Sequence, residues 1–370
     1  MRWAPFALER FFARYEFSID YVLCASDCES MTLGELLALE PGAAAAFQEL
    51  WLGYTESAGN PELRQQIAAI YESIESDEVL VHSGAEEAIF LLMHALLEAG
   101  DHLVVQWPCY QSLAEVARGL GCQVRRWSVR ASDGWVLDPD ELERLVDGDT
   151  RLVVINTPHN PTGYHMPPQV YERVVELANT HGFHLFSDEV YRESEYKAGA
   201  RLTASCDLGE RMLSLGVMSK TYGLPGLRVG WLATHDAALL ARVAQLKDYT
   251  TICNAAPSEF LATLALRHRA RLAARSVALL RRNLVALEAF MAAHTEVFDW
   301  IRPQAGPIAF PRLVGSAARE GALAFCERTA TMSGVLLLPG DVYDSPGHVR
   351  VGFGRRDMPA ALSQLDAHLS

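Results

Sequence analysis

Apolar and polar residues divide most of the chain into two kinds of segment. Short apolar runs that end in polar motifs are typical of buried parallel strands, and longer amphipathic segments are typical of the helices that cover them. The two kinds alternate from about residue 60 to 255, with predicted strands at 78–82, 103–105, 152–155 and 183–186. This pattern predicts an α/β fold with a mainly parallel sheet between helices.

The two ends of the chain differ from this middle part. An amphipathic segment from Phe6 to Phe17 precedes an irregular stretch, and a long-helix pattern from about Leu279 to Phe290 precedes shorter apolar runs. A chain of 370 residues is long for a single core. We expect an N-terminal segment (1–35) that packs on a small domain or a dimer partner, a large domain (36–280) and a small C-terminal α/β domain (281–370).

The most specific chemical signal is the glycine-rich run 216–230, which contains Lys220. Small and apolar neighbours leave a lysine poorly hydrated, so its amine can lose its proton and attack a carbonyl. Ser219 and Arg228 can bind a phosphate beside it. This combination suits a Schiff base with pyridoxal phosphate, although these residues alone also fit a solvated lysine in a surface loop.

A second signal is the turn Ser83-Gly84-Ala85, which lies between a predicted strand and a predicted helix. A turn of small residues at the start of a helix points free backbone N–H groups at an anion. The turn could therefore hold a phosphate. An ordinary strand-to-helix turn has the same composition, so the motif is weak by itself.

Two polar motifs directly follow predicted strands. They are Asn-Thr-Pro-His-Asn-Pro-Thr-Gly at 156–163 and Ser-Asp-Glu-Val-Tyr at 187–191. The carboxyl ends of parallel strands open on a common site, which would bring Asn160, Asp188 and Tyr191 together. Without further information, Asp188 could equally cap a helix and Asn160 could be a turn residue.

These four motifs resemble, in order, those of the class I and II aminotransferases, which are fold-type-I enzymes that use pyridoxal 5′-phosphate. The resemblance covers most of the chain. It implies that Lys220 carries the cofactor as a Schiff base and that Asp188 keeps the pyridine nitrogen protonated. It also implies that Asn160 and Tyr191 hydrogen-bond the phenolic oxygen of the ring.

The same resemblance assigns the remaining cofactor contacts. The phosphate site would consist of Ser83, Gly84, Ala85, Ser219 and Arg228. Further residues have the following implied roles: Tyr110 stacks on the pyridine ring, with Trp107 as its competitor; Tyr54 reaches the phosphate in the neighbouring subunit; and Arg350, on a predicted strand at 349–353, together with Asn160, binds the substrate α-carboxylate. The tyrosine match implies a homodimer.

The implied reaction is ping-pong transamination between an L-amino acid and a 2-oxo acid. The same apparatus also supports elimination and cyclisation. Segments 32–36, 306–312, 326–328 and 334–340 resemble capreomycidine synthase, a family relative that cyclises a hydroxylated arginine, whereas 188–191 keeps the ordinary aminotransferase form. A lyase or cyclase of specialised amino-acid metabolism is therefore the second hypothesis.

One departure from the family concerns the loop that borders the substrate. Residues 25–29 replace the usual Gly-Glu-Pro-Asp-like sequence, which leaves the substrate open. Asp27 and Glu29 in this loop could select a cationic amino acid, although solvated loop charges are the alternative.

Composition narrows the classes of partner. With 32 basic and 46 acidic residues the formal charge is −14, which argues against nucleic acid or an anionic membrane as a partner. The sequence contains neither a signal-peptide core nor a run long enough to span a membrane, so we expect a cytoplasmic protein. Seven cysteines without a paired framework fit reduced thiols, and their spacing predicts no metal site.

Overall fold

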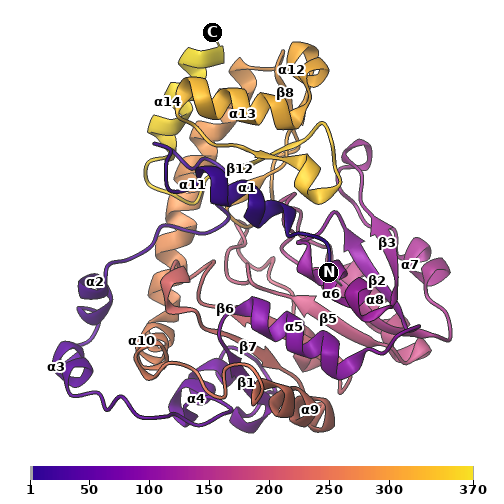
Figure 1. Ribbon diagram of the computed structural model, residues 1–370, viewed down its shortest axis with the longest axis vertical. Coiled ribbons are helices and arrows are strands. Elements are labelled where there is room, and N and C mark those ends of the chain that lie inside the picture. The colour runs from indigo at the N-terminus through magenta and orange to yellow at the C-terminus, as the bar shows by residue number, and fades with distance from the viewer. Residues whose placement is uncertain (1–2, 370) are drawn as a thin grey trace.

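The computed structural model describes residues 3–369; positions 1 and 2 of the predicted N-terminal segment, and position 370, lie outside the described residues. A seven-stranded sheet forms its centre, in the order β1-β7-β6-β5-β4-β2-β3 (Figure 1). Strand β7 is antiparallel to both of its neighbours, and all other pairs are parallel. The predicted mainly parallel sheet is confirmed. The strands are β1 (Val79–His82), β2 (His102–Trp107), β3 (Gln123–Ser128), β4 (Thr150–Asn156), β5 (His184–Asp188), β6 (Met212–Val217) and β7 (Gly230–Ala233).

Helices cover both faces of this sheet because its inner strands are apolar on both sides. On β4, Leu152 and Val154 pack with α5, α6 and α9, whereas Val153 and Ile155 pack on the opposite face with α7 and α8. Helices α4 and α10 pack against β1 and β7. These helices are α4 (Pro61–Ala68), α5 (Ala85–Leu96), α6 (Ser112–Leu120), α7 (Pro139–Leu145), α8 (Pro168–His181), α9 (Ala237–Lys247) and α10 (Ala256–Arg267).

A long helix, α11 (Arg269–Ala293), leads from the sheet to a C-terminal lobe at the top of Figure 1. The expected domain boundary at residue 280 falls inside this helix. In the lobe, β9, β11 and β12 form one small antiparallel sheet, and β8 pairs with β10. Its elements are β8 (Phe298–Asp299), β9 (Ile308–Ala309), β10 (Arg312–Leu313), β11 (Leu338–Pro339), β12 (Val349–Gly352), α12 (Gly315–Glu320), α13 (Ala322–Ser333) and α14 (Met358–Leu369).

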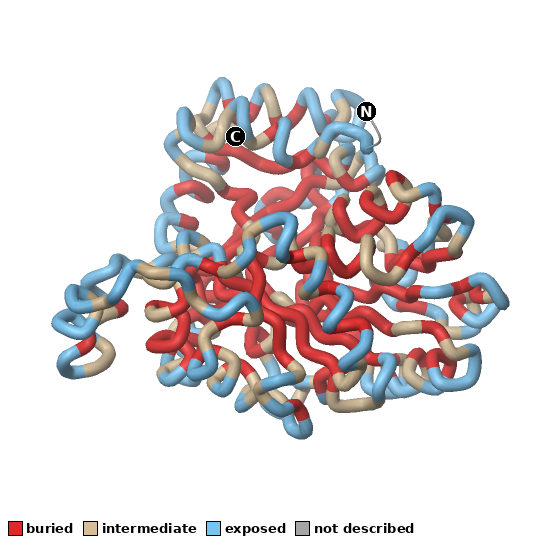
Figure 2. Tube along the Cα trace, turned by 60° about the horizontal axis from the view of Figure 1, so that its bottom comes forward, coloured by how far each residue is buried: buried red, intermediate tan, exposed pale blue. Residues whose placement is uncertain are grey.

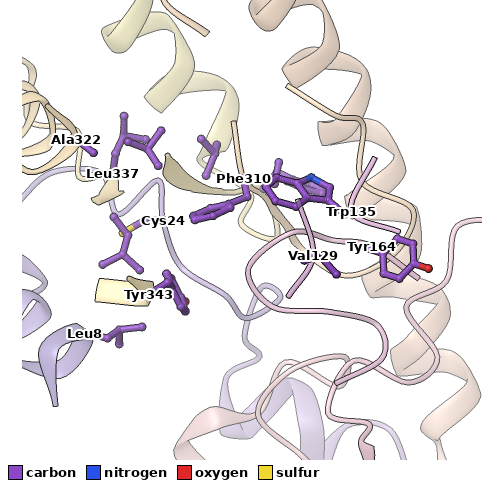
Figure 3. Close-up of a cluster of buried hydrophobic side chains, with 14 of the residues drawn as sticks. Leu8, Cys24, Val129, Trp135, Tyr164, Phe310, Ala322, Leu337 and Tyr343 are labelled. Carbon is purple, nitrogen blue, oxygen red and sulfur yellow. The ribbon is translucent and has the colours of Figure 1, made fainter. Parts of the chain in front are cut away.

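The first helix, α1 (Ala7–Tyr15), lies between the C-terminal lobe and the sheet (Figure 1). Its Arg14 pairs with Glu327 of α13 at 3.0 Å, and its Ala7 N–H donates to Gln111 Oε1, beside α6, at 2.8 Å. Figure 3 shows Leu8 of α1 in the same buried cluster as Tyr343 of the lobe. Helix α1 is therefore fixed to both parts of the molecule.

The next two helices, α2 (Leu33–Leu37) and α3 (Ala43–Gln48), form an arm that is largely exposed, at the left edge of Figure 2. The strands of the central sheet are the most buried part of that view. Among residues 3–369, no helix is both long enough and apolar enough to cross a bilayer. Short 3₁₀ helices connect several elements: η1 (Ser76–Glu78), η2 (Ala131–Asp133), η3 (Ser205–Leu208), η4 (Pro225–Leu227) and η5 (Gly340–Tyr343).

Candidate active site

A pocket of about 360 Å³ lies at the edge of the sheet where the parallel strands end. The end of β5, the turns after β4 and β6, the start of α5, helix α1 and strand β12 all contribute to its wall. Sequence positions from 8 to 355 therefore meet in one cavity. Most of the predicted site residues line it: Ala85, Tyr110, Asn160, Asp188, Tyr191, Ser219, Lys220, Arg228 and Arg350.

Lys220 lies in the turn that follows β6. Its Nζ donates a hydrogen bond to Ser26 Oγ at 2.9 Å, from the loop that follows α1. Burial lowers the pKa of the Lys220 amine below its ordinary value, although the nearby Asp27 carboxylate opposes this shift. An amine with a lowered pKa is more often unprotonated, which is the state that attacks a carbonyl.

Asp188 is the last residue of β5, and only 5% of it is exposed. Its Oδ1 accepts a hydrogen bond from the Val190 N–H at 3.2 Å. Within residues 3–369, no side chain hydrogen-bonds to or forms an ion pair with this carboxylate. Burial raises the pKa of Asp188 to about 7. A buried carboxylate that forms no ion pair points to a ligand that supplies a proton or a positive charge.

The start of α5 and Arg228 together form an anion site. Gly84 precedes the helix with a φ of 90°, and no side chain caps the first turn. A Cβ on Gly84 would lie 2.5 Å from Arg228 Nη2, and a Cβ on Gly230 would lie 2.7 Å from the Ala85 nitrogen. Glycine at both positions therefore lets the guanidinium approach the free helix N–H groups, which suits a phosphate.

Ser83 is placed differently from its neighbours in this turn. Its N–H donates to Glu87 Oε2 at 2.6 Å, and Ser83 does not line the pocket. Its assignment as a phosphate contact has less support than those of Ala85 and Ser219, which do line it.

Arg350 on β12 is held rigidly, with only 2% of the residue exposed. Its Nε and Nη2 donate to the Cys24 carbonyl oxygen at 3.1 and 2.8 Å, and its Nη1 donates to Asn160 Oδ1 at 3.3 Å and to Tyr343 Oη. Tyr343 Oη also donates to Asn160 Oδ1 at 3.1 Å. The chain thus fixes a guanidinium in the pocket wall, where it can meet a carboxylate.

The aromatic residues differ in position. Tyr110 lines the pocket, whereas Trp107 does not and instead packs against Arg126, whose guanidinium carbon lies 3.8 Å from the ring centroid. Tyr191 is buried and donates from its Oη to the Ser26 carbonyl oxygen at 3.0 Å. Tyr54 is 84% exposed and lies in a separate pocket between α3 and α10.

The two acidic residues of the 25–29 loop have different surroundings in the structure. Asp27 lines the pocket, but both of its oxygens accept hydrogen bonds from Arg355, at 2.9 to 3.1 Å. Glu29 lies outside the pocket, where its carboxylate accepts from the Arg356 N–H at 2.8 Å. Of the two open interpretations, Glu29 therefore fits the loop charge better than the substrate contact, because this loop packs along residues 352–356, with the Glu29 N–H bonded to the Gly354 carbonyl.

Sequence reasoning gave no role to several residues of the pocket wall: Glu9, Phe12, Glu16, Ser26, Glu86 and Arg355. Glu9 and Glu16 are seven positions apart on the amphipathic N-terminal segment, a spacing that places them on one helix face. This spacing is the sequence feature that could have indicated a shared acidic face. Glu86 is the second residue of α5; its side chain lines the pocket and accepts a hydrogen bond from Ser112 Oγ at 3.0 Å, and burial raises its pKa to about 7.

Comparison with known proteins identifies the class of this site. Residues 21–362 match the family model for aminotransferase class I and II, and the chain belongs to this family. It is 31% identical to capreomycidine synthase of Streptomyces vinaceus, over 94% of this chain and 90% of that protein. It is 30% identical to the arginine–pyruvate transaminase AruH of Pseudomonas aeruginosa, over 84% of this chain and 81% of that protein.

Two solved structures have the same fold. A PLP-dependent aminotransferase from Streptococcus suis superposes with a TM-score of 0.93 and 29% identity, over 100% of this chain and 98% of that one. The PLP-dependent cyclase OrfR superposes with a TM-score of 0.91 and 33% identity, over 99% and 97%. The protein is thus a fold-type-I enzyme that uses pyridoxal 5′-phosphate. The relatives include both aminotransferases and cyclases.

The residues of the pocket fit this cofactor. Lys220 offers an amine of lowered pKa for its aldehyde, and Arg228 with the start of α5 offers a cradle for its phosphate. The unpartnered carboxylate of Asp188 offers a counter-charge for its pyridine nitrogen. All three groups line one cavity.

Proposed function

We propose that the protein is an aminotransferase that moves an amino group between an L-amino acid and a 2-oxo acid by a ping-pong mechanism. The observation that carries this proposal is the meeting of Lys220, Asp188 and Arg350 in a single pocket, because transamination needs an amine, a pyridine counter-ion and a carboxylate anchor. These residues come from the two lobes of the molecule.

The binding roles follow from the contacts of each residue. Arg228, Ser219, Ala85 and the N–H groups at the start of α5 would hold the phosphate. Asp188 would pair with the protonated pyridine nitrogen. This pairing would offset the free-energy cost of burying the negative charge of the Asp188 carboxylate. Tyr110 would cover the ring, and Asn160 and Tyr191, which lie in the same wall, would contact its phenolic oxygen.

Lys220 would transfer the proton. Bound pyridoxal phosphate supplies an electron sink that stabilises negative charge on the substrate α carbon. Lys220 Nζ would take the proton from this carbon and later give it up again, because its lowered pKa suits an amine that both accepts and returns a proton. Ser26, whose Oγ accepts from Nζ, would hold the amine in position between these steps.

Arg350 would fix the orientation of the substrate. Its hydrogen bonds to Cys24, Asn160 and Tyr343 leave it little freedom, so a carboxylate bound to it is held in one place. Orientation of this kind makes proton removal from the α carbon faster than removal from other positions.

A lyase or cyclase reaction is the alternative. The identity to capreomycidine synthase and to the cyclase OrfR favours it, since each comparison covers more than nine-tenths of the chain. Because both reactions begin with the same loss of the α proton, the roles of Lys220, Asp188 and Arg350 are the same for either.

The decisive experiment follows the absorbance of the purified holoenzyme while amino acids are added one at a time. Transamination predicts that the visible band of the lysine-bound cofactor falls, that the pyridoxamine form appears, and that added 2-oxo acids reverse the change. Mass spectrometry of the products then separates the reactions. Ammonia or a cyclised amino acid, without a 2-oxo acid product, would replace transamination by the alternative.

We also propose a homodimer in which Tyr54 reaches the phosphate of the partner's cofactor. Three aromatic or aliphatic side chains near the arm are exposed: Trp51, Leu52 and Tyr54, at 78%, 77% and 84%. An exposed apolar group of this kind is typical of a surface that a second copy covers.

A further inference from the structure

One face of α1 forms part of the wall of the active-site pocket. Glu9 and Phe12 of α1 line the cavity, as does Glu16, which directly follows the helix and keeps a helical backbone conformation. Spacings of three, four and seven positions place these residues on one side of a helix. Since α1 is fixed both to α13 and to the segment before α6, this side is held over the pocket.

The two carboxylates on this face lack a cation. Within residues 3–369, neither Glu9 nor Glu16 forms an ion pair, and the polar side-chain contact of Glu9 is with Tyr110 Oη at 3.5 Å. Burial and then the charge of Glu9 raise the pKa of Glu16 above its ordinary value, while Arg355 opposes this shift. A cation placed here would relieve the repulsion between the two carboxylates.

The positive groups of the pocket are already engaged elsewhere. Arg355 forms its ion pair with Asp27 at 2.9 Å. Arg350 is bonded to Cys24, Asn160 and Tyr343, and Arg228 lies against the start of α5. The face of α1 therefore presents net negative charge to whatever enters beside it.

A second feature of the same pocket shows that it is built for a ligand. Asp188 is more than nine-tenths buried and lines the cavity, and the hydrogen bond to its carboxylate comes from the backbone N–H of Val190 and not from a side chain. The carboxylates of Glu9 and Glu16 thus border the pocket that holds the cofactor-binding residues.

We propose that Glu9 and Glu16 bind the cationic side chain of the substrate, so that the enzyme acts on a basic L-amino acid with a guanidinium group. This inference rests on the proposed function and names its substrate class. A planar guanidinium can pair with two carboxylates at once. Phe12, between them on the helix, offers an apolar face for the methylene stem of such a side chain.

Arginine and citrulline test this inference, because they have nearly the same shape and differ in charge. We expect the wild-type holoenzyme to process arginine with a kcat/KM roughly a hundredfold above that for citrulline, at about tenfold for each charge-assisted carboxylate contact. In the double variant Glu9→Gln with Glu16→Gln, this preference should fall to within about threefold, mainly through a lower value for arginine. Calorimetric dissociation constants for both amino acids should change in parallel, independently of turnover.

The matched control is Glu172→Gln, which removes an exposed carboxylate of α8 that does not line the pocket and leaves the anchors of α1 intact. It should affect arginine and citrulline equally. An unchanged arginine preference in the double variant, or a wild-type enzyme that favours citrulline, would overturn the inference. If other amino acids convert the cofactor but arginine does not, only this inference fails. If no amino acid changes the cofactor spectrum or yields product, the proposed function fails with it.

Discussion

At the scale of single residues, the pocket adjusts its ionisable groups by burial. Burial favours the uncharged form of a group, so it lowers the pKa of Lys220 and raises that of Asp188. The Lys220 amine is therefore more often in its reactive, uncharged form, and the Asp188 carboxylate is stabilised by a ligand that brings a positive charge. These opposite shifts at one site are typical of catalytic residues.

The amine itself can be tested by Lys220→Ala. This variant should lose the visible absorbance of the lysine-bound cofactor, and its turnover should fall by about 10²–10⁴-fold or more, because no other amine can transfer the proton. Lys197→Ala, which alters an exposed lysine, should leave both properties unchanged. A Lys220→Ala enzyme that remained fully active would remove the central element of the proposed function.

The raised pKa of Asp188 predicts a pH dependence for the cofactor-free protein. Below pH 3.8 the carboxyl is protonated in the folded and unfolded states, so it has no effect on stability. As pH rises from 3.8 to about 7, the unfolded state ionises first, and the folded state loses stability relative to it. Above about 7 the difference is constant.

Replacing this group by Asp188→Asn should therefore stabilise the cofactor-free protein, with a gain that grows up to about pH 7. Denaturant midpoints at pH 5, 6 and 8 would measure it. If the gain in stability is the same at all three pH values, ionisation of the Asp188 carboxyl does not destabilise the folded state, and the prediction is wrong. The holoenzyme variant should be nearly inactive, because the pyridine nitrogen loses its counter-charge.

At the scale of elements, two short turns carry the proposed phosphate-binding residues and Lys220. The turn between β1 and α5 and the turn after β6 lie against each other because β7 runs between β1 and β6. Glycine at positions 84 and 230 allows this close approach. The order of the strands therefore determines where the first turn of α5 lies relative to Lys220 and Arg228.

Gly230→Ala tests this contact. Its added Cβ would lie 2.7 Å from the backbone of residues 84 and 85, so the turn has to shift. We expect a loss of stability of about 1–3 kcal/mol and weaker cofactor binding, measured by thermal unfolding and cofactor titration. Gly226→Ala is the control, because nothing lies within 4 Å of its added Cβ. Equal effects of the two changes would contradict the role of the turn.

At the scale of the whole molecule, the site depends on contacts between distant parts of the chain. Arg350 of the C-terminal lobe bonds to Cys24, and Lys220 bonds to Ser26, both in the segment after α1. This segment pairs with the lobe through Tyr21 and Val335. The lobes are thus joined through the same residues that complete the pocket.

The proposed dimer can be tested by mixing two inactive variants. If Tyr54 contributes to the partner's site, a Tyr54→Ala subunit lacks the tyrosine that it gives to its partner. A Lys220→Ala subunit lacks the lysine of its own site. A mixed dimer then contains one complete site. Co-refolded mixtures should regain activity toward half that of the wild type per mixed dimer, whereas each variant alone stays impaired. Absence of recovery, with mixed dimers shown by native mass spectrometry, would contradict a shared site.

The sequence by itself determined the parts of the protein that depend on local pattern. The apolar runs predicted strands that lead into the site, and the motifs at the ends of two of them predicted Asn160, Asp188 and Tyr191 in one cavity, because strand ends in a parallel sheet must meet. The family resemblance of the glycine-rich run added Lys220 to the same cavity. Only the tertiary structure decided the pocket wall that α1 provides, the pairing of Asp27 with Arg355, and the exclusion of Glu29. These features depend on how segments more than 300 positions apart pack against each other, and no local pattern in the chain specifies that packing.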